Sequence, residues 1–117
     1  MRDDRGQASI ELVGIVPGLL VAALLVVQVG VVGTVLVSTE SAARAGARAE
    51  GQTCNGVQVA EQAPPGWLQD ESAARRVGSP DDTVTVEVST RVPVLFSRLA
   101  LPGPVTRSAT FPRTGDC

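Results

Sequence analysis

The stretch LVGIVPGLLVAALLVVQVGVVGTVLV, residues 12–37, decides the fold of this chain. It carries no charged side chain, and Gln28 is its one strongly polar residue. As a helix, these roughly 26 residues span about 39 Å, which exceeds the hydrocarbon core of a bilayer. A helix of a globular core is seldom apolar on all sides over such a length. The stretch therefore predicts a membrane-spanning helix.

The helix is expected to continue beyond the apolar run. Residues 38–51, STESAARAGARAEG, are rich in alanine and carry Arg and Glu side chains, a composition that favours helix. Gly51 and Asn55 then supply stop signals. We expect one helix over residues 7–50, about 65 Å long, with roughly half of it in the membrane and the rest projecting beyond.

The remaining chain, residues 51–117, predicts a small head. Two prolines indicate a loop over AEQAPPG, residues 60–66. Residues 67–77, WLQDESAARRV, carry acids early and two arginines late. That charge order suits a helix dipole, so a short amphipathic helix is expected there. GSPDD, residues 78–82, is typical of a turn, with its aspartates as turn formers.

The clearest strand is TVTVEVSTRVPV, residues 83–94, because apolar and polar side chains alternate along it. Pro93 lacks an N–H and indicates a sheet edge at that strand end. Residues 95–104 predict an apolar turn that either closes the core or forms an exposed patch, and residues 105–112 are expected to return as an antiparallel partner strand. The expected fold class is α+β: a long N-terminal transmembrane helix extending into a small extracytoplasmic head with a short helix and a two- or three-stranded antiparallel sheet.

Composition argues against several functions. The formal net charge is −2, so no basic surface suggests nucleic acid as a partner. The chain has no His, which removes the usual residue of metal sites and of acid–base catalysis. No serine has an evident base, and no glycine-rich phosphate loop is present. We expect a protein that is not an enzyme and has no catalytic residue, cofactor or metal site.

Two cysteines stand at Cys54 and Cys117. Their spacing matches no metal-binding motif. If the head lies outside the cytoplasm, a disulfide is the expected state, and closing so long a loop would stabilise the head by up to about 4 kcal/mol. Two unrelated thiols are the alternative.

The stretch RGQASIEL, residues 5–12, places a carboxylate, Glu11, directly before the apolar run. Burying an unpaired charge is unfavourable. Glu11 therefore either stays in the interfacial water, near the positive end of the helix dipole, or pairs with a group on another molecule. Counted from Gln7, as though the chain were cut after Gly6, Glu11 is the fifth residue.

This arrangement resembles the processing site of type IV prepilins and pseudopilins, which have a short charged leader, Gly before the cut, Glu five residues after it, and a long apolar helix. The leader MRDDRG, residues 1–6, and the compact chain look most like the TadE-like minor pilins of the tight-adherence (Flp) pilus system. Leu12 stands where the Flp-type site usually has an aromatic residue.

The resemblance implies roles for single residues. A prepilin peptidase would cut between Gly6 and Gln7, where the absence of a side chain on Gly6 lets the enzyme approach the backbone. The new amine of Gln7 on one subunit would meet Glu11 of a neighbour. An ion pair in a low-dielectric surrounding sets strong attraction against heavy desolvation, so it favours one stagger between subunits.

Two further features of the apolar helix suit assembly. Gly14, Gly18 and Ala22 form a ridge of small residues that allows close helix packing in lipid. Pro17 is expected to kink the helix or loosen its first turns, although prolines are tolerated in membrane helices for other reasons.

The leading hypothesis is a minor pilin or pseudopilin, a structural or assembly component of a tight-adherence type IV pilus or secretion machine. Its expected partners are the peptidase, other pilin subunits, platform proteins of the inner membrane, and the membrane itself. We expect a single-pass protein of the cytoplasmic membrane with its N-terminus in the cytoplasm. The first alternative is a signal-anchored protein whose head binds an extracytoplasmic ligand or partner. The second is a secreted domain released near Ala45.

Overall fold

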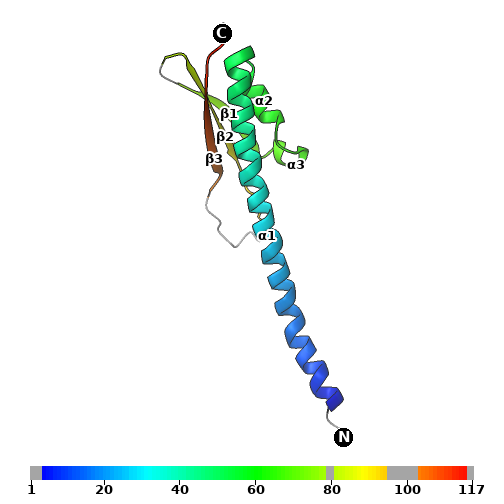
Figure 1. Ribbon diagram of the computed structural model, residues 1–117. Coiled ribbons are helices and arrows are strands. Elements are labelled where there is room, and N and C mark those ends of the chain that lie inside the picture. Colours follow the sequence, from blue (N-terminus) through cyan, green and yellow to red (C-terminus); the bar gives the residue numbers. More distant parts are fainter. Residues whose placement is uncertain (1–3, 79–80, 95–102, 116–117) are drawn as a thin grey trace.

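The computed structural model describes residues 4–78, 81–94 and 103–115. The chain forms a rod of 85 × 20 × 19 Å. One long helix runs along the rod, and a small head packs against the C-terminal half of that helix (Figure 1). The elements in chain order are α1 (Asp4–Thr53), α2 (Gly56–Gln62), α3 (Gly66–Gln69), β1 (Ser72–Val77), β2 (Thr83–Thr90) and β3 (Val105–Pro112). The expected α+β fold is confirmed.

Helix α1 contains 50 residues and continues through Pro17. At 1.5 Å per residue it is about 75 Å long. The helix ends where Cys54 adopts a left-handed backbone with φ of 62°. A left-handed residue after the last helical turn is a common way to stop a helix. The long N-terminal helix predicted from the sequence is therefore confirmed, and it begins and ends a few residues further out.

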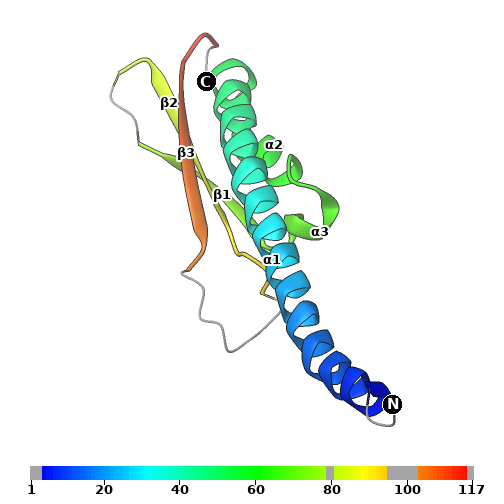
Figure 2. The same cartoon turned by 60° about the horizontal axis from the view of Figure 1, so that its bottom comes forward.

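The three strands form one antiparallel sheet in the order β1-β2-β3. Along the central strand β2, burial alternates residue by residue, with Val84, Val86, Val88 and Thr90 buried. This period of two confirms the alternating strand predicted over this region, and β3 confirms the predicted return strand. The buried face of the sheet lies against α1 (Figure 2).

The core of the head is built from small side chains on the helices and valines on the sheet. Its fully enclosed members are Ala42, Ala43, Ala47, Ala60, Val86 and Val88. Helices α2 and α3 lie beside α1 on the side away from β3 (Figures 1 and 2). A Cβ placed on Gly46 of α1 would lie 2.7 Å from the Cβ of Ala60 in α2. The two helices therefore approach so closely that glycine is required at this point.

The predicted amphipathic helix over residues 67–77 is wrong in its larger part. Helix α3 ends at Gln69, and residues Ser72–Val77 form strand β1. In that strand Arg75 lies opposite Glu87, and Arg75 Nη2 is 2.6 Å from Glu87 Oε1. A favourable charge at a helix terminus contributes less than about 1 kcal/mol. A full ladder of hydrogen bonds and cross-strand pairs to β2 outweighs it.

Two other boundaries differ from the prediction. Strand β2 ends at Thr90, four residues before the predicted end at 94. Beyond it, Arg91 N donates to Glu71 O at 2.8 Å, one further contact in the register of β1 and β2. Because β2 is the central strand, Pro93 lies past its end and not at a sheet edge. The predicted loop over residues 60–66 is also partly helical, since α2 extends to Gln62 and only then meets the two prolines.

Candidate functional site

The predicted processing and pairing residues lie at the start of α1, away from the head. Gly6, Gln7 and Glu11 are all exposed. A Cβ on Gly6 would meet nothing within 4 Å, so the backbone there is accessible from outside. Gln7 and Glu11 are four residues apart, which places their side chains on one helix face. Among the residues that the structure describes, Glu11 has no hydrogen-bond or ion-pair partner.

The predicted helix-packing ridge is uncovered. Gly14, Gly18 and Ala22 follow each other at intervals of four residues, and all three are exposed. Added Cβ atoms at Gly14 and Gly18 would meet nothing within 4 Å. The helix is continuous at Pro17, so the predicted loosening of its first turns is not seen in the helical backbone. No described residue of the head covers this ridge, so it leaves space for a neighbouring helix.

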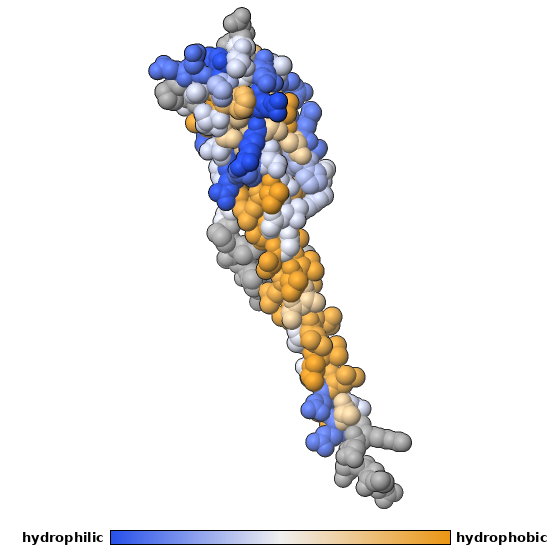
Figure 3. Space-filling view, in the orientation of Figure 1, coloured by the Kyte–Doolittle hydropathy of each residue, from blue (hydrophilic) through white to orange (hydrophobic). Residues whose placement is uncertain are grey.

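The lower part of α1 is apolar and exposed on every side. All residues from Gly6 to Val27 are exposed. The large apolar side chains among them are Ile10, Leu12, Val13, Ile15, Val16, Leu19, Leu20, Val21, Leu24, Leu25, Val26 and Val27. Figure 3 shows this band of hydrophobic surface below the polar head. Within the part of the chain that the structure describes, α1 is long and apolar enough to cross a membrane, by length and composition.

Gln28 marks the point where the head begins to cover α1. Its side chain is buried, and Nε2 donates to the carbonyl oxygen of Pro93 at 3.2 Å. One buried hydroxyl of α1, that of Thr39, donates to Thr90 Oγ1 at 2.9 Å. Sequence reasoning did not assign a role to either residue. As the single strongly polar side chain in the apolar run, Gln28 was the available signal.

A buried carboxylate joins the far end of α1 to the rest of the head. Glu50 is 2% exposed, and its Oε2 accepts a hydrogen bond from Gly56 N at 2.8 Å. Its Oε1 forms an ion pair with Arg76 of β1. One side chain thus connects α1, the start of α2 and the sheet. Sequence reasoning missed this contact, because no local pattern pairs residues that far apart in the chain.

Of the two cysteines in the predicted disulfide, the structure describes Cys54. Cys54 is disulfide-bonded and not a free thiol. Cys117 lies outside the described residues, so the pairing of Cys54 with Cys117 stays a prediction. The backbone after β3 lies close to the end of α1, since the N–H groups of Thr114 and Gly115 donate to Gly51 O at 2.9 and 3.0 Å. The segment before Cys117 therefore lies beside the end of α1 that carries Cys54.

Other predicted features fall in the loops of the head. The expected apolar turn over residues 95–104 lies mostly outside the described residues. Asp81 and Asp82 have φ values of 30° and 42°. Short polar side chains such as Asp tolerate this left-handed region, which suits their predicted role in a turn. That the chain has no catalytic residue, cofactor or metal stays a prediction.

Comparisons of the chain with protein-family models, with curated proteins and with solved structures find no match. The function is therefore inferred from the fold and from the residues of α1 alone.

Proposed function

We propose that this chain is a minor pilin or pseudopilin, a structural or assembly component of a tight-adherence type IV pilus or secretion machine. A prepilin peptidase cuts it between Gly6 and Gln7. Helix α1 crosses the cytoplasmic membrane with its N-terminus in the cytoplasm, and the head lies outside. Its partners are other pilin subunits and platform proteins of the inner membrane.

The observation that carries the proposal is the surroundings of Glu11. This carboxylate is exposed at the start of a helix that is apolar on all sides, and it has no partner among the described residues. A charge at this position is tolerated at the membrane surface, but it becomes costly when the helix enters an apolar assembly. An amine on Gln7 of a second subunit would neutralise it there. The uncovered ridge of Gly14, Gly18 and Ala22 supports the same proposal, since it leaves room for a neighbouring helix.

The first test is the intact mass and N-terminal sequence of the chain isolated from its native membranes. A chain that begins at Gln7, with or without an added methyl group, supports processing. A chain that still begins at Met1 contradicts it, and then favours the alternative of a signal-anchored protein with an extracytoplasmic binding domain. A start beyond Ala45 would contradict both, because the apolar helix would be lost with the cleaved segment.

The second test addresses the role of Glu11. We expect Glu11→Ala to be cleaved normally but to enter assembled pilin fractions at a level lower by about tenfold or more, which corresponds to about 1.4 kcal/mol. Immunoblots of membrane and sheared-filament fractions measure both steps. Glu61→Ala, which removes an exposed carboxylate from α2, is the matched control. Normal incorporation of the Glu11 variant would contradict the pairing role and leave the cleavage result unaffected.

A further inference from the structure

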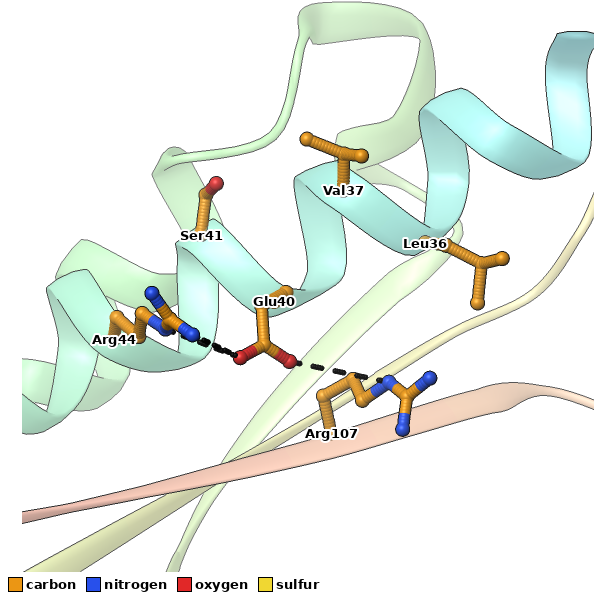
Figure 4. A pocket seen from close by; sticks show the side chains of 6 residues that line it. All are labelled: Leu36, Val37, Glu40, Ser41, Arg44 and Arg107. Carbon is orange, nitrogen blue, oxygen red and sulfur yellow. Dashed lines mark hydrogen bonds and ion pairs between the residues drawn. The ribbon is translucent and has the colours of Figure 1, made fainter.

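An open pocket of about 400 Å³ lies at the end of the apolar run of α1, between this helix and β3. It is lined by Leu36, Val37, Glu40, Ser41, Arg44 and Arg107. The first five belong to α1 and the last to β3. Figure 4 shows the Glu40 carboxylate between the two guanidinium groups. Arg44 Nη2 is 2.8 Å from Glu40 Oε1, while Arg107 Nε is 3.9 Å from Glu40 Oε2.

The charges of this pocket favour an anion. Two guanidinium groups face a single carboxylate, so the formal charge of the group is +1. A guanidinium has five N–H donors. Arg44 directs Nε and Nη2 to the same oxygen of Glu40, and Arg107 makes no hydrogen bond among the described residues. Most donors of both side chains are therefore free, and both side chains are more than half exposed.

The position of the pocket along α1 identifies the kind of anion. Glu40 follows Glu11 by 29 residues, and the segment between them carries no charge. That separation corresponds to about 43 Å of helix, close to the thickness of a bilayer with its headgroups. If Glu11 lies at one membrane surface, Glu40, Arg44 and Arg107 lie at the level of the opposite headgroups.

The apolar and charged residues of the pocket follow one another in the order in which a phospholipid carries its acyl chains and its phosphodiester. Leu36 and Val37 precede the charged residues on α1, so they lie toward the apolar band, and Val37 is 68% exposed. The arginines lie on the side of the head. A phospholipid changes from apolar to charged in the same direction, from its acyl chains to its phosphodiester headgroup.

We propose that this pocket binds the headgroup of a membrane phospholipid, with Arg44 and Arg107 donating hydrogen bonds to its phosphodiester oxygens. Arginine suits this task because its planar fork of donors matches the geometry of phosphate oxygens. Glu40 lies between the two guanidiniums and offsets their mutual repulsion in the absence of lipid. The inference rests on the membrane placement in the proposed function, and it is independent of cleavage and of filament assembly.

The test uses the full chain in micelles of a neutral maltoside detergent that contain phosphatidylglycerol. Native mass spectrometry measures the fraction of protein that retains lipid. We expect the double variant Arg44→Gln, Arg107→Gln to lower the ratio of lipid-bound to free protein by about tenfold. Arg75→Gln is the control, because Arg75 is also well exposed but lies in β1 and pairs with Glu87. Circular dichroism of each variant verifies that the head remains folded.

Glu40→Gln separates lipid binding from a purely structural ion pair. If the arginines bind phosphate, removal of the competing carboxylate raises lipid retention. If the three residues only stabilise the head, the variant behaves like the arginine variants or like the wild type, which would overturn the proposal. Equal retention by the wild type and the double arginine variant would overturn it as well.

Two further measurements distinguish a phospholipid from a free anion and test the membrane placement. If millimolar inorganic phosphate displaces the lipid, the pocket is a site for a free anion and the proposal is wrong. Flotation of the wild type with phosphatidylglycerol vesicles tests the membrane placement separately. A chain that does not float contradicts both this inference and the membrane part of the proposed function. A chain that floats but retains lipid independently of the arginines contradicts this inference alone.

Discussion

The two halves of α1 differ in what surrounds them, although they form one continuous helix. From Gly6 to Val27 the helix carries large apolar side chains that no part of the described chain covers. From Gln28 onward one face is buried under the head, and most of the buried residues there are small: Thr39, Ala42, Ala43, Gly46, Ala47 and Gly51. Large side chains suit a surrounding that adapts to them, such as lipid. Small ones suit a rigid surface of the same molecule, because they let the sheet and α2 approach the backbone.

Apolar composition alone therefore does not show whether a helical segment is covered by the head or left exposed. Val35 and Val27 belong to the same uncharged run, yet the first is fully buried by the head and the second is exposed. The described head already covers one face of α1 within the predicted membrane segment 12–37. The fully uncovered part, residues 6–27, is about 33 Å long, so the rest of the predicted membrane segment, residues 28–37, runs beside the head.

The largest expected effect concerns the end of the covered half. Cys54→Ser should lower the free energy of unfolding of the head by about 4 kcal/mol, because the long loop to Cys117 would no longer be closed in the unfolded chain. Chemical denaturation followed by the fluorescence of Trp67 in detergent micelles measures this. Reduction of the wild type should reproduce the effect, and reduction of the variant should add nothing. Equal stability of oxidised wild type and variant would show that no such bridge closes the head.

An intermediate effect compares the two halves with one substitution. Gly46→Val should destabilise the head by about 2 kcal/mol or more, since a Cβ at Gly46 already overlaps Ala60 and Gly56 O. Gly18→Val is the matched control, because it changes the same residue type in the same helix where nothing lies within 4 Å. Its denaturation midpoint for the head should equal that of the wild type. If both variants destabilise the head equally, close packing around Gly46 is not the cause of the effect.

The smallest effect lies at the boundary between the halves. Gln28→Leu removes the hydrogen bond to Pro93 O and should weaken the local attachment of the segment after β2 by about 1 kcal/mol. Amide hydrogen exchange at Val92 and Val94 should accelerate by roughly fivefold. Thr34→Val serves as the control, because the Thr34 hydroxyl bonds only within its own helix, to Gly30 O. Unchanged exchange in the Gln28 variant would mean that the contact does not hold this segment.

Much of the fold is predictable from local patterns. The uncharged run of residues 12–37 specifies a long helix, and the alternating valines of residues 84–88 specify a strand with one buried face. Both signals arise from the spacing of side chains along the backbone, which needs no knowledge of distant partners. The candidate residues Gly6, Gln7 and Glu11 are also visible from spacing alone.

Only the tertiary structure decided how the remaining segments are used. Residues Ser72–Val77 carry a charge order that suits a helix, but the free edge of β2 makes them a strand. The contacts of Gln28 with Pro93, of Glu50 with Arg76 and of Glu40 with Arg107 join residues that are far apart in the sequence. The sequence by itself determined which segments are apolar and with what period. The packing of α1 on the sheet determined which of those segments are covered, because burial depends on the partner surface and not on the segment alone.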